Sequence, residues 1–476
     1  MPAKLTIMDE RTVKKDSVIG SLLGGAVGDA LGYPVEFWST DEIFRKYGKP
    51  GITEMKLNDA GFAEVSDDTQ MTLFTANEIC FGMTRGAMRG VGGNPCGYVQ
   101  HAYLDWLYTQ EHEYFMDPLP EDYHPCCWIM AIPELYSRRA PGNTCITALR
   151  ALRDGKPVTN DSCGCGSVMR LAPVGLIPDY STHPWEQELL QEAIAGAEIT
   201  HKHFLSTLAS VFFVALIYHL SHEVFSFDTF EEYITVAKDA TRICFQREDS
   251  TRKSYIDKFF FLIDKAVALA HENNDDPRAI EAIGGGWTAH EAVAIAVYAC
   301  VKYQDSFEKA VIAAVNHGGD SDSTGALCGN LMGAWLGKDA IPKRWTEHLE
   351  LYDTIEELAQ DLAGGIPISE YEPRDTLYKQ NWFFKYCEQQ YLVREQIGAR
   401  KLIQDDGFFD AVSLVCFWND YFVFEPYCRE WCSMDIVPII GYPQYILTKP
   451  GHRPRWADDD EIRAIMDYLP DDEEDE

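Results

Sequence analysis

The sequence is short of positive charge. Its 476 residues include 41 lysines and arginines against 75 aspartates and glutamates, which gives a formal net charge of −34. A nucleic acid or an anionic membrane surface would be repelled by such a chain, so we expect neither as a partner. A ligand that bears phosphate groups would need local cations or helix N-termini to offset this field.

Long apolar runs and paired cysteine motifs are also scarce. We expect no membrane span, because the apolar runs fall short of the roughly 20 residues that one requires. Charges interrupt the N-terminal stretch where a secretory signal needs an apolar core. The 14 cysteines are scattered and form no CxxC pair. We therefore expect a reduced chain without an export signal, located in the cytoplasm.

Strand patterns are few in the first three quarters of the chain. Across residues 17–365 the apolar positions recur with a period near 3.6, which predicts a mostly helical domain with functional loops at the helix ends. A glycine-rich stretch at residues 84–97 predicts a loop, and it lacks the GxGxxG of a dinucleotide-binding fold.

Length and composition predict more than one domain. We expect a helical domain over residues 1–365 and an aromatic-rich extension over residues 366–456, with strands within residues 409–424. The acidic tail at residues 457–476 predicts a short helix followed by a disordered end.

The stretch HGGDSDSTGA, residues 317–326, places two carboxylates and two hydroxyls within five residues. Asp320 and Asp322 are two apart, and in a loop or first helical turn this spacing can bring both to one cation. Hard oxygen ligands of this kind suit Mg²⁺, Mn²⁺ or Ca²⁺. The small, apolar residues 325–337 predict a buried helix after the acids. An acidic helix cap is the alternative interpretation, since Asp and Ser are favoured at that position.

A second acidic cluster, Ser66-Asp67-Asp68-Thr69, precedes an amphipathic helical pattern. One of these residues would suffice as a cap, so four oxygen-bearing side chains in succession indicate a further set of hard ligands. Glu36 stands among Val35, Phe37 and Trp38. A carboxylate in such surroundings is a candidate for a raised pKa or a metal contact, and a solvent-facing loop glutamate is the alternative.

Two further motifs are candidates for ligand contacts. The small-residue loop DSCGCGSVMR, residues 161–170, could hold a phosphate or a base on its N–H groups. Cys163 and Cys165 lack a second Cys or His pair at zinc spacing, which argues against a zinc site. His201 and His203 precede a strongly apolar helical segment, where they are either substrate contacts or polar boundary residues.

Taken together and in this order, GGAVGDALGYPVEF, SDDT, GCGSVMRLAPVGL, THKH, GGGWTAHEAVAIAVYA and NHGGDSDSTGALCGNLMGAWLG resemble the ADP-ribosylglycohydrolase family over roughly residues 15–365. That family includes the dinitrogenase-reductase-activating glycohydrolases and the ADP-ribosylhydrolases. The resemblance implies an all-α orthogonal multi-helix bundle, a binuclear Mg²⁺ or Mn²⁺ centre, and cleavage of the bond that joins ADP-ribose to a protein side chain.

The resemblance also implies roles for individual residues. The metal ligands that it implies are Ser66, Asp67, Asp68, Asp320, Asp322 and Ser323. Glu36 matches the family's N-terminal glutamate, a catalytic acid or base or a gate over the metals. We expect Glu36 or a metal-bound water to transfer the proton, with Asp68 and Asp322 as less favoured bases. The substrate-binding residues that it implies are Asp29, Gly164, Cys165, Gly166, Ser167, Met169, His201 and Gly319. Cys165 stands where some relatives have asparagine. We expect the diphosphate on the N–H groups of residues 164–169.

The expected activity is therefore removal of ADP-ribose from an arginine or serine side chain, with an ADP-ribosylated protein or ADP-ribose as the partner. Two alternatives stay open. One is an immunity or interaction protein that blocks a toxin ADP-ribosyltransferase. The other is a catalytically silent ADP-ribose-binding protein.

Overall fold

The computed structural model describes residues 13–89, 97, 99–114, 127–178, 185–222, 224–272, 275–364, 400–401, 412–418, 421–426, 446–448 and 455–468. The chain divides into two compact units, each taken by itself below. Unit 1 comprises Met1–Ile79, Cys96–Tyr108 and Arg138–Gly365, and unit 2 comprises Cys80–Pro95, Thr109–Ser137 and Ile366–Glu476. Unit 1 ends at Gly365, and the sequence does not indicate that residues 80–95 and 109–137 group with the C-terminal part.

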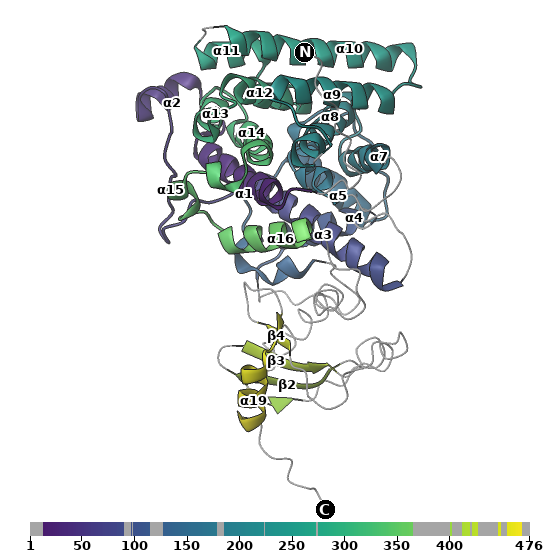
Figure 1. Ribbon diagram of the computed structural model, residues 1–476, viewed down its shortest axis with the longest axis vertical. Helices are drawn as coiled ribbons and strands as arrows, with labels where there is room; N and C mark the ends of the chain where they lie inside the picture. Colours follow the sequence, from purple (N-terminus) through teal and green to yellow (C-terminus); the bar gives the residue numbers. More distant parts are fainter. Residues whose placement is uncertain are drawn as a thin grey trace, which may run out of the picture. The chain divides into compact units, whose positions relative to one another are not determined.

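Helices build almost all of unit 1 (Figure 1), and the helices named next include those of unit 2. In chain order the α-helices are α1 (Lys15–Gly32), α2 (Thr40–Tyr47), α3 (Asp67–Arg89), α4 (Val99–Glu111), α5 (Asn143–Arg153), α6 (Ala172–Gly175), α7 (Trp185–Glu198), α8 (Phe204–Ser221), α9 (Phe230–Cys244), α10 (Ser250–His271), α11 (Asp276–Ile283), α12 (Ala289–Lys302), α13 (Phe307–Val315), α14 (Ser321–Leu336), α15 (Lys343–Thr346), α16 (Tyr352–Gly364) and α19 (Asp459–Tyr468). Short 3₁₀ turns are η1 (Tyr33–Val35), η3 (Trp128–Ala131), η4 (Pro133–Tyr136), η5 (Cys165–Ser167) and η6 (Lys338–Ala340).

These helices confirm the predicted helical domain, including the buried helix after the acids. The predicted loop at residues 84–97 is wrong in its first part, because α3 continues through Arg89. Glycine lowers helix propensity but does not stop a helix that begins with strong apolar periodicity.

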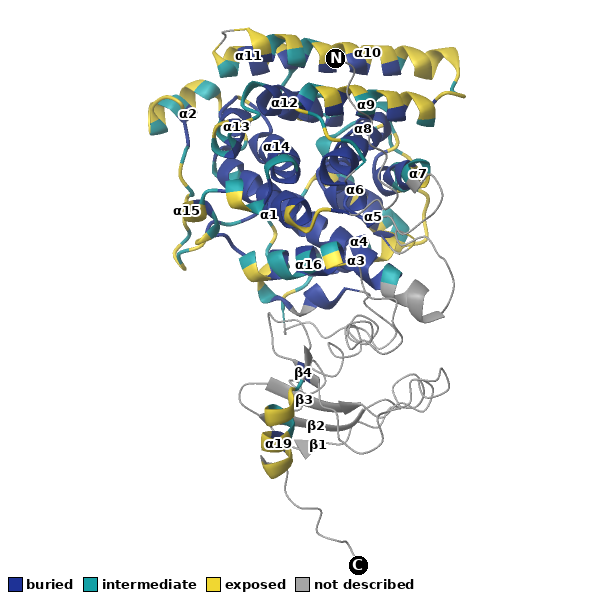
Figure 2. Ribbon diagram, in the orientation of Figure 1, coloured by how far each residue is buried: buried dark blue, intermediate teal, exposed yellow. Residues whose placement is uncertain are grey.

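Glycines bring α1 and α14 into backbone contact at the centre of unit 1. Gly20, Gly24 and Gly28 recur every fourth residue on α1, and each faces a backbone carbonyl of a glycine on α14. A Cβ atom at any of these positions would overlap that carbonyl. Both helices are buried along most of their length (Figure 2). The close approach outweighs the helix-propensity cost of about 0.5–1 kcal/mol per glycine.

Two helices of the core are long and apolar enough to cross a membrane by length and composition alone. They are residues Lys15–Val35 and α8, with mean hydropathies of 1.3 and 1.8. This corrects the expectation that all apolar runs fall short of that length. In both cases 89% of the apolar window is buried inside the protein, as in a core helix.

The C-terminal part of unit 2 contains an antiparallel sheet with strands in chain order. The strands are β1 (Arg400–Lys401), β2 (Val412–Trp418), β3 (Tyr421–Pro426), β4 (Ile446–Thr448) and β5 (Arg455–Trp456). The β2–β3 hairpin pairs Trp418 with Tyr421 and confirms the strands predicted within residues 409–424. The acidic tail contains α19, the short helix that was predicted, and its last residues lie outside the described part of the chain.

Candidate metal centre

The packing of α1 on α14 brings the end of one helix to the start of the other. Gly32, the last residue of α1, lies against the carbonyl of Ser321 at the start of α14. The chain leaves α1 through η1 and reaches Glu36 directly. The acids of the 317–326 motif and Glu36 therefore meet at one place, although about 280 residues separate them along the chain.

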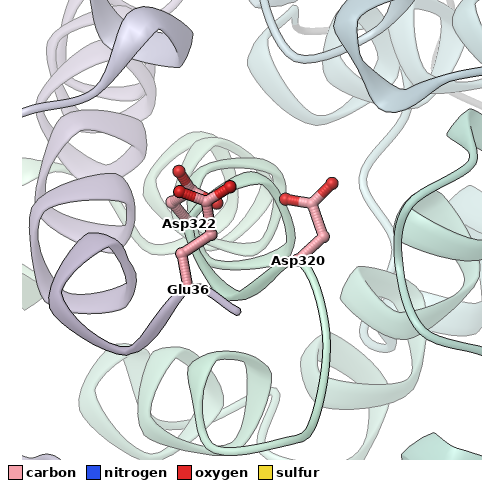
Figure 3. A group of neighbouring side chains, drawn as sticks. All are labelled: Glu36, Asp320 and Asp322. Carbon is pink, nitrogen blue, oxygen red and sulfur yellow. The ribbon is translucent and has the colours of Figure 1, made fainter. Parts of the chain in front are cut away.

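Glu36, Asp320 and Asp322 form a group whose carboxylate oxygens lie within 4.8 Å of one another. Figure 3 shows the three carboxyl groups at the N-terminal end of α14, with Glu36 supplied by the segment after α1. Asp320 and Asp322 are each 3% exposed. The second oxygen of Glu36, Oε2, is buried without a hydrogen-bond partner.

Asp320 occupies the N-cap position of α14, yet its side chain makes no capping hydrogen bond. Its Oδ2 instead lies 2.8 Å from the thiol of Cys165. This geometry argues against a helix cap as the explanation of the motif, because a cap would accept from the backbone of the first turn.

Asp29 holds the first acidic cluster beside this group. It is fully buried, and its carboxylate accepts hydrogen bonds from the N–H groups of Ser66 (3.0 Å) and Thr69 (3.1 Å) and from the Thr69 hydroxyl (2.5 Å). Ser66 caps α3 by accepting from the Asp68 N–H at 3.2 Å. Asp67 accepts from the Gly142 N–H at 3.2 Å. The cluster is thus fixed from several sides.

A second set of contacts supports the same segment from outside. Arg139 forms ion pairs with Glu64 (3.4 Å) and Glu350 (3.2 Å). Glu350 also accepts from the Val65 N–H at 3.2 Å, and the Arg139 carbonyl accepts from the Asp67 N–H at 3.2 Å. These contacts hold the segment that leads into α3, and they thereby fix the positions of Asp67 and Asp68.

The pKa of every acid in the centre is raised. Burial is the largest cause in each case, and repulsion from Asp322 is the next for Asp29, Glu36, Asp67, Asp68 and Asp320. The pKa of Asp29 rises to about 7 and that of Glu36 to about 10. Because Asp322 raises the pKa of Asp67 and of Asp68, the two clusters lie close to each other.

The loop at residues 163–169 is tied to the segment that precedes α12. The Cys165 N–H donates to the Trp287 carbonyl (3.1 Å), and the Ala289 N–H donates to the Cys163 carbonyl (2.9 Å). Within the loop, the N–H groups of Ser167, Val168 and Met169 donate to loop carbonyls. These amides already have backbone partners in this structure, and a diphosphate on the N–H groups of residues 164–169 stays a prediction.

Three residues that are predicted to contact the substrate instead contact other parts of the protein in this structure. Asp29 uses both oxygens on the first cluster. His201 is 2% exposed, its Nδ1 lies 2.8 Å from the Thr200 hydroxyl, and its ring faces Gly164 and Gly166. Burial, with the Arg170 charge, lowers the pKa of His201 to about 3, so the ring is neutral. Gly319 lies against the Gly285 carbonyl. In this structure these residues position other parts of the site, and a direct substrate contact for them stays a prediction.

Sequence reasoning missed an aromatic pair beside Glu36. The rings of Phe37 and Trp287 stack with centroids 5.3 Å apart and an interplanar angle of 21°. Both are exposed, at 67% and 44%, and Phe37 has a left-handed backbone with φ of 67°. Such a conformation is costly for an aromatic residue, and it orients the ring toward Trp287. The sequence shows only that an aromatic residue follows Glu36 directly, and nothing in it links Phe37 to Trp287.

Comparisons with known proteins show what this chain is similar to. A family model described as ADP-ribosylglycohydrolase matches residues 10–370. An uncharacterized protein of Archaeoglobus fulgidus is 29% identical over 72% of this chain and 94% of its own. The ADP-ribosyl-[dinitrogen reductase] glycohydrolase of Rhodospirillum rubrum is 26% identical over 71% of this chain and 91% of its own. Human ADP-ribosylhydrolase ARH3 is 26% identical over 42% and 58%, respectively. A solved chain described as an ADP-ribosylglycohydrolase-related protein complex aligns with 25% identity and a TM-score of 0.46, over 74% of this chain and 98% of that one.

Fold and site define a helical protein with a buried carboxylate centre between the N-terminal ends of α3 and α14. The family match, which spans most of the chain, identifies it further. The chain belongs to the ADP-ribosylglycohydrolase family and is a hydrolase acting on glycosyl bonds. The resemblance expected from the motifs is confirmed.

Proposed function

We propose that this protein is a hydrolase that depends on two divalent cations, Mg²⁺ or Mn²⁺, and removes ADP-ribose from a modified arginine or serine side chain. The observation that carries the proposal is the buried convergence of Glu36, Asp320 and Asp322 with the Asp67–Asp68 cluster. The names of the relatives from Rhodospirillum rubrum and human support the ADP-ribosyl substrate.

The residues present fit hard divalent cations. The donors are carboxylate and hydroxyl oxygens, the ligands that Mg²⁺ and Mn²⁺ prefer. Oδ2 of Asp68 and Oε2 of Glu36 are buried without a hydrogen-bond partner. Among the described residues, no ion pair includes an acid of the centre, and the nearby Arg139 is engaged by Glu64 and Glu350. Buried carboxylates that repel one another need a compensating positive charge.

Glu36 is the residue best suited to proton transfer. Its side chain is partly buried at the edge of the centre, and it shares a hydrogen bond with Asp322. With its pKa raised to about 10, it is protonated at neutral pH in the cation-free protein. Positive charge nearby would lower this pKa toward the working range of an acid–base group. Glu36 can therefore donate a proton from Oε2 to the departing side-chain nitrogen or oxygen.

The remaining acids, Asp68 and Asp322, have supporting roles beside Glu36. Glycoside cleavage passes through an oxocarbenium-like state and ordinarily uses two carboxyl groups. Asp322 accepts the hydrogen bond of Glu36, and Asp68 offers a free oxygen on the opposite cluster. When bound, a cation pair would supply Lewis-acid polarisation and orient the vicinal diol of the ribose. Asp68 and Asp322 are the less favoured bases toward the attacking water.

Turnover of defined peptides tests this proposal. Purified full-length protein is incubated with peptides that carry ADP-ribose on arginine or on serine, first with Mg²⁺, then with EDTA, and then with Mn²⁺ added back. We expect ADP-ribose release from one peptide, loss of release with EDTA and recovery with Mn²⁺. The matched control is Glu281→Gln, which neutralises an exposed acid outside the centre. Undiminished release after complete removal of metal would contradict the cation requirement. Binding of ADP-ribose without release would favour the catalytically silent alternative.

We also propose that the protein acts in the cytoplasm, without nucleic acid or a membrane surface as partner. Cysteines without a disulfide support a reducing compartment: within the described residues these include Cys145, Cys163, Cys165, Cys244, Cys300 and Cys328. The net charge of −34 supports the exclusion of anionic partners. Binding to a toxin ADP-ribosyltransferase is a separate prediction, to be measured with that protein directly.

A further inference from the structure

Two exposed aromatic side chains lie beside the carboxylate centre, and the chemistry proposed above does not use them. The rings of Phe37 and Trp287 stack with their centroids 5.3 Å apart. The Phe37 side chain is 67% exposed and that of Trp287 is 44% exposed, so neither ring fills the core. Single exposed apolar side chains are common, but two that gather beside a polar centre are a candidate contact for a ligand.

Both rings belong to residues that follow a backbone position at the centre. Phe37 comes directly after Glu36, and a carboxylate oxygen of Glu36 lies within 4.8 Å of one of Asp320. Trp287 comes directly after Gly286, where a Cβ atom would lie only 3.3 Å from the Cβ of Asp320. The aromatic pair therefore lies next to the acid that we assign to proton transfer.

The backbone that carries Phe37 is strained. Its φ of 67° is a left-handed value that a bulky side chain avoids. Such strain persists only where the surrounding structure fixes it, and it gathers at ligand sites. The strain therefore favours a role for the ring beyond filling space.

The position beside Glu36 indicates the acceptor side of the substrate. In the proposed reaction Glu36 donates its proton to the departing acceptor side chain, so a ring on the next residue lies close to that leaving group. The adenine of ADP-ribose is separated from the bond that breaks by two riboses and two phosphates. Of the two acceptors, arginine offers a planar cation that stacks on aromatic faces, whereas serine offers neither a plane nor a charge.

The electrostatic surroundings also favour a cation. The net charge of the chain is −34, and the acids of the centre lie beside the pair. Among the described residues, no lysine or arginine lies over the ring of Phe37 or Trp287. Lys46 lies instead over the ring of Trp38, 4.8 Å from its centroid. The two exposed rings are therefore open to a cation from the substrate.

We propose that Phe37 and Trp287 bind the guanidinium group of an ADP-ribosylated arginine, so that the pair selects arginine over serine as the acceptor. The inference rests on the proposed function, since it names the acceptor for the same centre. The pair adds no chemical step. It binds the acceptor before and during cleavage, so its loss raises KM and leaves kcat near the wild-type value.

Steady-state kinetics on two peptides of one sequence test the inference in the full-length protein with Mg²⁺. One peptide carries ADP-ribose on arginine and the other on serine. The variants Phe37→Leu and Trp287→Leu, alone and together, remove the aromatic faces, whereas Phe37→Tyr and Trp287→Phe keep them. Phe261→Leu is the matched control, because Phe261 on α10 is 72% exposed. Circular dichroism checks that each variant is folded.

We expect the wild-type protein to prefer the arginine peptide. Each leucine variant should raise KM for that peptide by about 2–30-fold, the equivalent of one cation–π contact. The variants that keep a ring, and Phe261→Leu, should stay near the wild-type value. Affinity for free ADP-ribose should not change. Binding of both peptides in EDTA is a second readout that needs no turnover, and there the double leucine variant should lose the preference for arginine.

The outcomes separate this inference from the proposed function. Release from the serine peptide alone, or an unchanged KM for the arginine peptide in the double leucine variant, would overturn the inference and keep the proposed function. Release from neither peptide would contradict the proposed function, and a ring-dependent preference for the arginine peptide in EDTA would still support the inference. An equal loss of affinity for free ADP-ribose would assign the rings to adenine and overturn the inference.

Discussion

The two acidic clusters look alike in sequence and differ in how they are held. Ser66-Asp67-Asp68-Thr69 starts α3, and Asp320 to Ser323 starts α14. The first cluster donates hydrogen bonds to buried Asp29, and its Asp67 accepts one from the Gly142 N–H. The second cluster turns its carboxylates toward Glu36 and Cys165. We infer that hydrogen bonds to the surrounding protein hold the first cluster in place, whereas the second cluster directs its carboxylates toward the other side chains of the centre.

Removing one acid from each cluster should have the largest effect on metal binding and turnover. The double variant Asp67→Ala/Asp322→Ala should abolish Mn²⁺ binding and lower turnover by more than about 10⁴-fold, beyond the usual effect of one proton-transfer group. Helical content should stay close to the wild-type value, because the loss of two buried carboxylates also removes the repulsion between them. Mn²⁺ binding, ADP-ribose release and circular dichroism measure the three effects. Full activity in the double variant would contradict the proposed mechanism.

Replacing Glu36 separates chemistry from metal binding. Glu36→Gln keeps the shape but cannot transfer a proton, so kcat should fall by about 10²–10⁴-fold while the number of bound Mn²⁺ ions is kept. Glu42→Gln, in the exposed helix cap of α2, is the control. If kcat were unaffected, proton transfer would have to be assigned to another acid.

Replacing Asp29 tests whether its hydrogen bonds hold the first cluster in the position that metal binding requires. Asp29→Asn places an amide N–H₂ group against donors of Ser66 and Thr69, so the cluster should loosen. Mn²⁺ affinity should fall by about 10–100-fold, as for other residues behind a metal ligand. Asp16→Asn, at the other end of α1, serves as the control, and it should leave the affinity near the wild-type value. An Asp29→Asn protein with wild-type affinity would contradict this role.

The pH dependence of stability gives the smallest effect. Because the pKa values of these acids are raised in the folded protein, it binds more protons than the unfolded chain above about pH 4. Their contribution to stability is therefore fully present below that pH and is lost as pH rises through about 7 for Asp29 and about 10 for Glu36. The Tm of the metal-free protein should fall between pH 5 and pH 8, at roughly 2–4 °C for each kcal/mol lost.

Thermal unfolding in EDTA and in Mg²⁺ measures this effect. Mg²⁺ should flatten the fall, since a bound cation offsets the repulsion between carboxylates. The Asp67→Asn/Asp322→Asn protein should show a shallower fall in EDTA than the wild type. Equal slopes in all three cases would mean that the centre does not control the pH dependence.

Local patterns in the sequence predict the helices and the two clusters well. The small, apolar residues 325–337 predict α14, which begins four residues earlier, at Ser321. The paired acids and the isolated glutamate predict the members of the centre. These signals lie within short windows, so no knowledge of distant contacts is needed.

Contacts between distant segments account for what the sequence does not predict. Nothing local shows that Asp29 turns to Thr69, or that His201 lies behind Gly166. The contact between Cys165 and Asp320 joins residues 155 positions apart. The use of loop amides by carbonyls of the same loop was missed because small residues predict an open loop and do not report its internal hydrogen bonds.

The most direct test of the central claim is the position of bound Mn²⁺, located by anomalous scattering in crystals of the full-length protein. We expect two ions about 3.5–4 Å apart, with ligands from both the Asp67–Asp68 cluster and the Asp320–Ser323 cluster. Ions bound elsewhere, or held by one cluster alone, would contradict a shared binuclear centre.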